Sequence, residues 1–568
     1  MKKVIILGGG VAGMSAAHEL INRGFEVEVY ERQLRYAGGK ARSVDVPGTA
    51  ISPFYKPLPG EHGFRFFPGF YKHITDTMKH IPFEKGKSCF DNLVPTKSVE
   101  TLQIGKLPIV LPVNFPSSYK DVFKIFESYL QSKTELTEAE LHAFTHRIWQ
   151  LMTSCSDRFL NEYEQISWWE FMEADKFSNN YRSLLVEGLT RSLVAAKAQK
   201  ASTKTVGTVL LQLLYLMINP TKGNTDCVLN GPTNDVWLNP WLSYLTEKGV
   251  KYVKGKETVE LLLTDNQISG ALIRDVDNPT VTQIVTGDYY LLAVPVEVAA
   301  KLITPELLKA DASLKNIIKL APNVEWMNGI QFYLTEPFNM HRGHTIYANS
   351  NWALTSISQI QFWQDYDIGS RFDGTVKGVL SVDISDWTNP GNFNKKAAQD
   401  CTIDEVKEEV WKQLKQEINS SLGHERLRDD MLRFVHLDSD IYPSSDEPSP
   451  LFTKTLPTPE ANKVHHLSNK EPLLVNQVNT WTLRPNSYTA IPNLFLASDY
   501  IKTNTDLATM EGANEAARRA VNNIIMSSGL KAEMCKIWKY ETPLVLKELQ
   551  LLDKKRFDKG LAWKSIIK

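Results

Sequence analysis

The stretch Val4-Ile5-Ile6-Leu7-Gly8-Gly9-Gly10-Val11-Ala12-Gly13 decides how the N-terminal part of the chain folds. Its four leading apolar residues predict a short buried strand, and residues 14–23 have the apolar spacing of a helix. Glycines at positions 8, 10 and 13 follow the pattern G-x-G-x-x-G. They permit a tight turn, close approach of a pyrophosphate, and packing of the helix on the strand. The stretch therefore predicts a dinucleotide site at the positive N-terminal end of this helix.

The residues that follow complete the same unit. A second apolar strand is expected over 26–30, and it ends at Glu31, 18 residues after Gly13. An acidic side chain at this spacing is placed to bind the ribose hydroxyls of an adenine dinucleotide. The glycine pattern alone also occurs in turns that bind no ligand. A bound dinucleotide is favoured because the first strand, the glycines, the helix, the second strand and the acid all occur in the expected order and spacing.

The composition is that of an ordinary globular protein. The chain has 568 residues, of which 42% are hydrophobic and 23% are charged, and its net charge is −1. A chain of this length is expected to form two or three structural units. The balanced charge gives no reason to expect a nucleic-acid partner.

Several features of the sequence bear on its location. The five cysteines are widely spaced and form no C-x-x-C pair, which is typical of a reducing compartment. No signal peptide is expected, and the longest apolar run, Val206–Ile218, is too short to span a bilayer. We therefore expect a cytoplasmic protein. The Lys-, Leu- and Trp-containing segment 543–563 leaves peripheral contact with the inner face of a membrane open. Packing of this segment on the body of the protein, or on another subunit of a homo-oligomer, is the alternative.

The rest of the chain divides by pattern. An aromatic and glycine-rich stretch at 61–71 precedes a helical region, with helices expected at Lys120–Lys133, Glu138–Thr153, Ser167–Glu173, Tyr181–Ala198 and Thr205–Met217. Sheet-forming segments return between 251 and 295. In the last block, 491–513, a strand ends at Asp499 and a helix begins near Met510. Residues 444–472 are interpreted as a surface loop, its His465-His466 pair as solvated, and no metal site is expected.

These blocks, in this order, resemble the FAD-dependent amine oxidase superfamily, most closely phytoene desaturases of plant and cyanobacterial type. The resemblance covers roughly residues 1–530. The motifs that carry it are Gly8-x-Gly10-x-x-Gly13 with Glu31, Gly38-Gly39-Lys40-Ala41, Glu61-x-Gly63 to Gly69-x-Tyr71, Leu229-Asn230-Gly231, Thr258 with Leu261, Ala293-x-Pro295, Arg484-Pro485, Leu496-Ala497-Ser498-Asp499 and Met510-Glu511-Gly512-Ala513. The first motif is shared by many dinucleotide-binding folds, whereas the N-terminal and C-terminal blocks together are specific.

The resemblance implies an α/β fold, in which a Rossmann-like FAD-binding domain is interleaved with a mixed α+β substrate domain and a helical cap. It assigns residues 1–75, 225–300 and 472–530 to the discontinuous FAD-binding domain. Residues 76–224 and 301–471 would form the substrate and cap domain, and 531–568 a C-terminal extension. The implied FAD contacts are Gly8, Gly10, Val11, Ala12, Gly13, Glu31, Arg32, Gly38, Gly39, Lys40, Thr258, Asp499 and Met510.

Two motifs depart from the family pattern. Phe64 and Arg65 stand where plant-type desaturases have a small hydrophobic residue and a histidine, which weakens the case for a carotenoid substrate. Ser498 replaces the glycine of the usual Ala-Gly-Asp.

An aromatic-lined cavity is expected between the FAD-binding and cap domains, with walls drawn from Phe64, Phe66, Phe67, Tyr71 and Trp481. Arg65, Tyr71 and Trp481 are the candidates for catalytic roles, and no general base is named. Arg65 is interpreted as the partner of an anionic substrate group or of the reduced flavin. A salt bridge inside the cap is the alternative.

The leading functional hypothesis is dehydrogenation of a largely hydrophobic small molecule, with hydride transfer to flavin N5. The sequence contains one dinucleotide fingerprint, so oxygen, a quinone or another carrier is expected as the electron acceptor rather than a built-in NAD(P)H site. The alternatives are a flavin amine oxidase, a redox-neutral isomerase or dehydroxylase, and a non-enzymatic FAD-stabilised binding protein.

Overall fold

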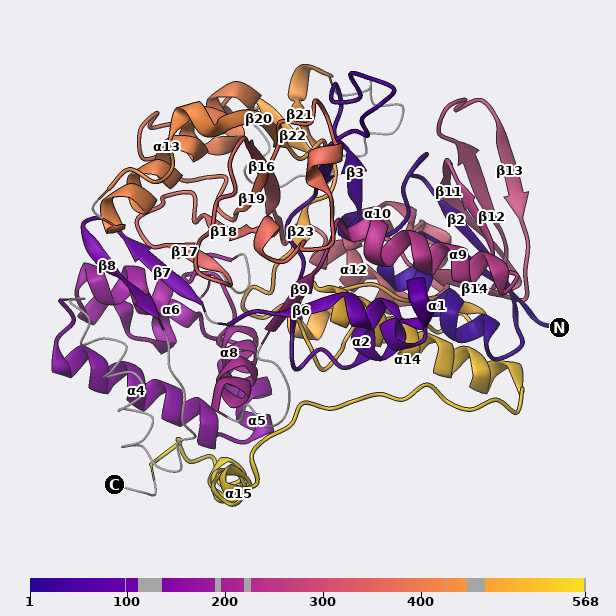
Figure 1. Ribbon diagram of the computed structural model, residues 1–568. Coiled ribbons are helices and arrows are strands. Elements are labelled where there is room, and N and C mark those ends of the chain that lie inside the picture. The colour runs from indigo at the N-terminus through magenta and orange to yellow at the C-terminus, as the bar shows by residue number, and fades with distance from the viewer. Residues whose placement is uncertain are drawn as a thin grey trace.

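The computed structural model describes residues 1–97, 99–110, 135–188, 190, 196–218, 226–422, 424–446 and 465–565. Figure 1 shows one sheet beside the N-terminus, a second sheet on the other side of the molecule, and a group of helices below the second sheet. The helix expected at Lys120–Lys133 lies outside the described residues.

The first sheet is assembled from segments that are far apart in the sequence. All four of its strand pairs are parallel. Its strands, in spatial order, are β10 (Lys251–Lys254), β2 (Glu26–Glu31), β1 (Lys3–Leu7), β14 (Tyr289–Leu292) and β24 (Leu494–Leu496). The last two strands are buried along their whole length, as expected for a parallel sheet covered on both faces. The predicted N-terminal strand–helix–strand unit is confirmed.

The side chains of β1 alternate between two apolar cores, one on each face of the sheet. Val4 and Ile6 pack with α1 (Val11–Ile21) and α14 (Met510–Ser528). Ile5 and Leu7 pack in the core on the opposite face. That core also contains residues of β11 (Lys256–Thr264), β12 (Gln267–Asp275), β13 (Thr282–Val285), α10 (Val296–Leu302), α11 (Pro305–Ala310) and α12 (Lys315–Leu320). One helix from each end of the chain thus covers the same face of the sheet.

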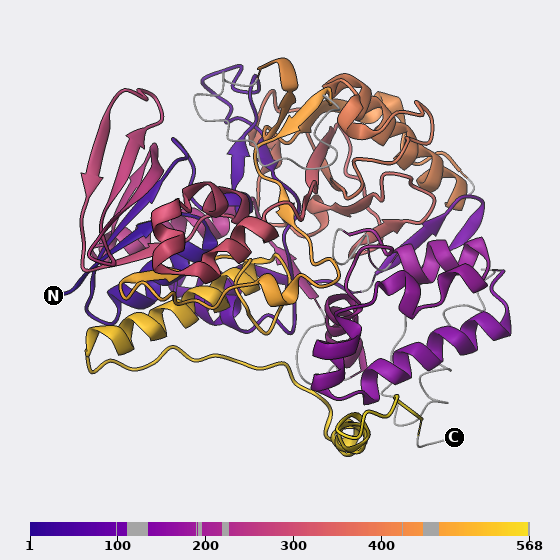
Figure 2. The same cartoon turned by 180° about the vertical axis from the view of Figure 1, so that it is seen from behind.

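The second sheet has seven strands and supports one long helix. Its strands, in spatial order, are β20 (Leu432–Leu437), β16 (Asn328–Leu334), β19 (Gly378–Ile384), β18 (Thr355–Ser358), β17 (Thr345–Tyr347), β7 (Glu100–Gln103) and β8 (Lys106–Val110). One face packs on α13 (Ile403–Leu422) through a core that contains Phe332, Val382 and Ile384. Figure 2 shows α13 on the outside of the molecule, so the opposite face of the sheet is turned inward.

Several short elements lie between these parts. The smaller sheets are β3 (Ser43–Asp45) with β4 (Pro59–Glu61), β5 (Phe66–Pro68) with β9 (Asp226–Leu229) and β6 (Leu93–Pro95), β15 (Val324–Glu325) with β23 (Leu473–Leu474), and β21 (Ile441–Pro443) with β22 (Leu467–Asn469). The helices α2 (His73–Lys79) and α9 (Asn239–Glu247) border the first sheet.

The helical group confirms most of the helices expected before residue 225. Its members are α4 (Glu138–Thr153), α5 (Ser156–Arg158), α6 (Trp168–Phe171), α8 (Thr203–Ile218) and a π-helical turn at Tyr181–Glu187. The expected helix from 181 to 198 is described only in part, because 189 and 191–195 lie outside the described residues, and its expected end is wrong, since 196–198 are not helical. No helix in the described ranges is both long and apolar enough to cross a membrane.

The C-terminal extension joins the two sides of the molecule. Figures 1 and 2 show an extended segment running from the end of α14, along the first sheet's helices, to α15 (Leu544–Phe557) beside α4 and α5. There the buried guanidinium of Arg158 donates to the buried carboxylate of Asp553 at 2.9 Å. The extension therefore packs on the body of this chain, which was one of the expected arrangements.

Candidate cofactor and substrate site

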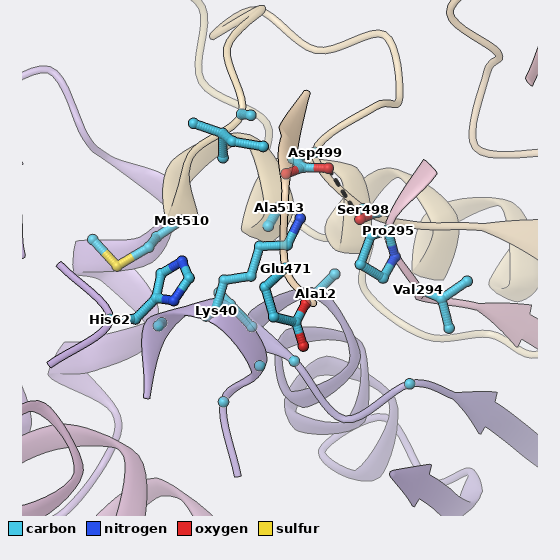
Figure 3. Close-up of a pocket in the computed structure, with 18 of the residues that line it drawn as sticks. Ala12, Lys40, His62, Val294, Pro295, Glu471, Ser498, Asp499, Met510 and Ala513 are labelled. Atoms are coloured by element: carbon cyan, nitrogen blue, oxygen red, sulfur yellow. Dashed lines mark hydrogen bonds between the residues drawn. The ribbon is translucent and has the colours of Figure 1, made fainter. Parts of the chain in front are cut away.

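A cavity of about 400 Å³ lies where the carboxyl ends of β1 and β2 meet the start of α14. Its walls come from both ends of the chain, as Figure 3 shows for Ala12 and Lys40 on one side and Asp499 and Met510 on the other. Of the implied FAD contacts, those that line it are Gly8, Gly10, Val11, Ala12, Glu31, Arg32, Gly38, Gly39, Lys40, Thr258, Asp499 and Met510. Segments nearly 500 residues apart are thus brought to one site.

Gly13 is the implied contact that does not line the cavity. A Cβ there would lie 2.0 Å from the carbonyl oxygen of Gly8, so this glycine lets α1 approach the turn below the cavity. Gly8 itself has a φ of 107°, in the left-handed region that glycine tolerates. Both roles are those that the spacing predicts for the first and third glycines.

The start of α1 is suited to a phosphate group. Its N-cap residue is Gly10, no side chain caps the helix, and no acidic residue lies in its first turn. The first-turn N–H groups and the helix dipole are therefore available to an anion. A Cβ added at Gly39 would lie 3.0 Å from the Cα of Gly10, so the two glycine turns pack backbone against backbone.

Glu31 lies at the end of β2, where the second strand was expected to end. Its carboxylate is buried and accepts hydrogen bonds from the backbone N–H groups of Gly9 and Gln33, each at 2.7 Å. Burial raises the pKa of Glu31, although both hydrogen bonds favour the charged form. Tyr252 of β10 also reaches this turn and donates its hydroxyl to the carbonyl of Gly9 at 2.7 Å. Nothing in the sequence pattern indicated that tyrosine.

Lys40 is a half-buried cation that lines the cavity. Figure 3 shows its side chain extending toward Asp499, and its ammonium lies 3.7 Å from the carboxylate of Glu297. Burial alone would lower the pKa of Lys40, but the carboxylates of Glu297 and Asp499 outweigh it and raise that pKa. Glu297 is a further member of the site that the motifs did not single out, and the pattern Ala293-x-Pro295 immediately before it was the available signal.

These residues fit FAD. The cavity offers an uncapped helix N-terminus for a pyrophosphate, a buried acid for a ribose, and a half-buried lysine between them and the start of α14. At the start of α14 the hydroxyl of Thr509 accepts from the N–H of Gly512, and Met510 occupies the first helical position. An N–H group at that position is oriented to stabilise negative charge on a bound ring.

The other end of the cavity carries aromatic and charged side chains. Phe64, Phe66 and Tyr71 line it, as expected, together with Arg65. Phe67 does not line the cavity, because its ring packs edge-on against Trp237. Burial raises the pKa of the Tyr71 hydroxyl, which is also hydrogen-bonded with Thr509.

Arg65 supports the turn that contains Lys40. Its guanidinium donates to the carbonyl of Lys40 at 2.8 Å and to that of Ala41 at 3.3 Å. Across the described part of the chain it forms no ion pair, so the expected alternative of a salt bridge inside the cap is not found. Burial lowers the pKa of Arg65, and the carboxylates of Glu61 and Asp383 act in the opposite direction.

Trp481 lies outside the lining of this cavity. The centroid of its ring is 3.6 Å from the ammonium of Lys204, and its backbone N–H donates to Glu164 at 2.7 Å. Lys204 in turn forms an ion pair with Asp506, next to the Leu507 and Ala508 that do line the cavity. Trp481 is therefore adjacent to the wall, and its catalytic role stays a prediction.

One cluster at the cavity wall, which includes the lining residue His62, has the residue types of a metal site. The Nδ1 of His62 lies 2.6 Å from Asp438 and 3.4 Å from Asp440, and Arg42 holds Asp440 with two hydrogen bonds of 2.6 and 2.8 Å. Although burial lowers the pKa of His62, Asp438 and Asp440 raise it to about 9. His62, Asp438, Asp440 and Arg42 thus form a network of ion pairs.

Comparison with known proteins agrees with this geometry. Residues 6–81 match the family described as NAD(P)-binding Rossmann-like domain, and residues 264–525 match flavin containing amine oxidoreductase. The chain is therefore similar to the FAD-dependent amine oxidase superfamily. The match to a flavin-containing family supports FAD as the cofactor, and the Rossmann-like match supports an α/β FAD-binding fold.

The chain is also similar to carotenoid desaturases. It is 36% identical to zeta-carotene desaturase of Capsicum annuum over 120 residues, which are 20% of this chain and 18% of that one. It is 20% identical to the probable zeta-carotene desaturase of Synechococcus elongatus over 550 residues, 93% of this chain and all of that one. The chain therefore matches its plant relatives over less than a fifth of their length.

Solved structures share the fold at low sequence identity. Putrescine oxidase bound to putrescine has a TM-score of 0.56 at 12% identity, covering 92% of this chain and 99% of that one. Cyclohexylamine oxidase from Brevibacterium oxydans has a TM-score of 0.56 at 11% identity, covering 93% and 99%. These two oxidases are named for different amines, so the shared fold does not choose among substrates.

The role of Glu31 gives a direct test of the cofactor end of the site. We expect Glu31→Gln to weaken FAD binding roughly tenfold or more. The Glu31 carboxylate accepts hydrogen bonds from two backbone N–H groups, whereas the glutamine amide would place its own N–H donor against one of them. Titration of the apoprotein with FAD, followed by flavin fluorescence, measures the change. The matched control is Glu28→Gln on the same strand, whose carboxylate binds Tyr30 and Lys3 instead. Equal FAD affinities in both variants would contradict the assignment.

Proposed function

We propose that the protein is an FAD-dependent oxidoreductase that dehydrogenates a largely hydrophobic small molecule. The observation that carries this proposal is the continuity of one cavity, from the dinucleotide turn at Gly8 and Gly10 to the side chains of Phe64 and Phe66. A lipophilic substrate in the aromatic end would lie next to the cofactor. The similarity to zeta-carotene desaturases supports desaturation as the type of reaction.

The chain's own residues supply binding, orientation and electrostatics. Bound FAD supplies an acceptor for the two electrons that leave the substrate. Lys40 is a fixed positive charge within the site, and the N-terminal end of α14 at Met510 adds a second positive potential. Arg65 holds the backbone of Lys40 in place, and the aromatic side chains exclude water from the reacting end.

We also propose that the chain divides into an FAD-binding domain and a substrate domain. Residues 1–75, 225–300 and 472–530 would bind FAD, and 76–224 with 301–471 would enclose the substrate. The FAD-binding domain is supported by the parallel sheet, because all of its strands come from the FAD-binding ranges. The substrate domain is supported by the seven-stranded sheet, because all of its strands come from the remaining ranges.

The flavin itself reports on this proposal. When the FAD-loaded protein is purified and the small molecules it retains are identified by mass spectrometry, we expect a lipophilic compound among them. Anaerobic addition of that compound should bleach the visible flavin absorbance, and admission of oxygen or a quinone should restore it. Bleaching by simple amines with peroxide release would instead indicate an amine oxidase. Turnover without any acceptor would indicate a redox-neutral enzyme.

We further propose that the outer face of α15 contacts an anionic membrane surface. Residues 531–568 contain ten Lys and Arg against five Asp and Glu. Leu546 and Asp553 of α15 face the protein, whereas Leu544, Leu551 and Leu552 are 79%, 63% and 40% exposed. Exposed leucines flanked by lysines are the pattern of a helix that lies in a membrane interface. A lipophilic substrate could then enter from the bilayer.

Vesicle sedimentation tests this contact. We expect the protein to sediment with vesicles of phosphatidylcholine and phosphatidylglycerol, and we expect Leu551→Ser with Leu552→Ser to reduce the bound fraction several-fold through lost apolar burial. The control is Ile284→Ser on β13, which removes an equally exposed apolar side chain from the first domain. Equal loss in both variants, or no sedimentation of the unaltered protein, would contradict the proposal.

A further inference from the structure

The inward face of the seven-stranded sheet is polar where it meets the cavity. On β19, Val382 and Ile384 point into the apolar core under α13, so Asp383 between them points the other way. Thr355 of β18 is the cross-strand partner of Asp383, and both line the cavity beside Phe64 and Arg65. A pocket for a pure hydrocarbon has no need of a carboxyl group in its wall.

Asp383 has an unused hydrogen-bonding atom. The residue is 7% exposed, and its Oδ1 has no hydrogen-bond partner among the residues that the structure describes. The loop opposite contains Gly63, where a Cβ would lie 2.8 Å from that oxygen, so only glycine lets this loop pack so closely against Asp383. A buried carboxyl oxygen without a partner is costly and calls for a ligand or another explanation.

The guanidinium of Arg65 offers the complementary donor. Its Nε and one terminal nitrogen bind the carbonyls of Ala41 and Lys40, while Nη1 makes no hydrogen bond to a described residue. Burial raises the pKa of Asp383 to about 7, and among the charges that oppose this rise Arg65 is the strongest, followed by His62 and His344. Arg65 and Asp383 thus influence each other across the same end of the cavity.

We propose that Asp383 and Arg65 bind a hydroxyl group on an otherwise apolar substrate. The hydroxyl hydrogen is donated to Asp383, and the hydroxyl oxygen accepts from Arg65. This inference names the substrate class for the site and rests on the proposed function. A substrate carboxylate would be repelled by the charged form of Asp383, and an ammonium group would be repelled by Arg65. A neutral group that both donates and accepts satisfies the two side chains together.

Matched isoprenoid probes test the inference through binding alone. The FAD-loaded protein is titrated with farnesol, with its methyl ether, which has no donor, and with farnesene, which has no oxygen. Binding is followed by the change in flavin absorbance. We expect farnesol to bind roughly tenfold or more tightly than either of the others, because only farnesol satisfies both side chains. Equal affinities for the three probes, or no binding of farnesol, would overturn the inference.

Variants of Asp383 separate recognition from general damage. Asp383→Val should abolish the preference for farnesol over its ether, and Asp383→Asn, which keeps an acceptor oxygen in a similar shape, should reduce it only in part. The control is Ser385→Ala, which removes a buried oxygen two residues along the chain and outside the cavity lining. An unchanged flavin spectrum confirms that each variant has folded. A preference that survives in Asp383→Val would overturn the inference.

The same titration distinguishes this inference from the proposed function. If farnesol binds selectively and no retained compound reduces the flavin, the hydroxyl site stands and dehydrogenation fails. If the flavin is reduced by a substrate and the three probes bind equally, dehydrogenation stands and the hydroxyl site fails.

Discussion

The packing of α14 on α1 is the constraint on which the site depends. These helices come from opposite ends of the chain, and they share an apolar core with β1. Alanines on both helices, such as Ala17 and Ala517, are fully buried there and allow the backbones to approach closely. A hydrogen bond of 2.8 Å from Asn514 to Ser15 fixes the register between them. Without this contact the two halves of the cofactor cavity would not meet.

A second contact locks the same arrangement. Glu511, one residue after Met510, accepts hydrogen bonds at 2.8 and 2.9 Å from the backbone N–H groups of Lys72 and His73, and one from Ile74. A carboxylate at this place satisfies donors that the start of α2 would otherwise leave unpaired. The C-terminal block therefore caps a helix of the N-terminal block, and the position of Met510 over the cavity follows from it.

Local patterns were sufficient to predict the cofactor end of the site. Gly8, Gly10 and Glu31 belong to one strand–helix–strand unit, in which chain geometry alone fixes their relative positions. The motif that contains Asp499 and Met510 could be placed because it ends a strand and starts a helix. These residues meet in the structure at the edge where the ligands of α/β sheets bind.

The substrate end could not be predicted in the same way. Asp383 lies in the middle of an alternating strand, and its place at the cavity depends on strand pairing with a segment far away. Glu297 and Tyr252 likewise reach the site only through sheet assembly. Trp481 was expected in the cavity wall, but its ring packs against Lys204 beside the wall. Such positions depend on tertiary packing, which spacing in the sequence does not encode.

The central claim is that both ends of the chain bind one FAD in this cavity. A crystal structure of the FAD-loaded protein tests it most directly. The account predicts density for one FAD with its pyrophosphate at Gly10, its adenosine ribose at Glu31 and its flavin ring beside Met510. Density for FAD elsewhere, or a protein that cannot be loaded with FAD at all, would contradict it.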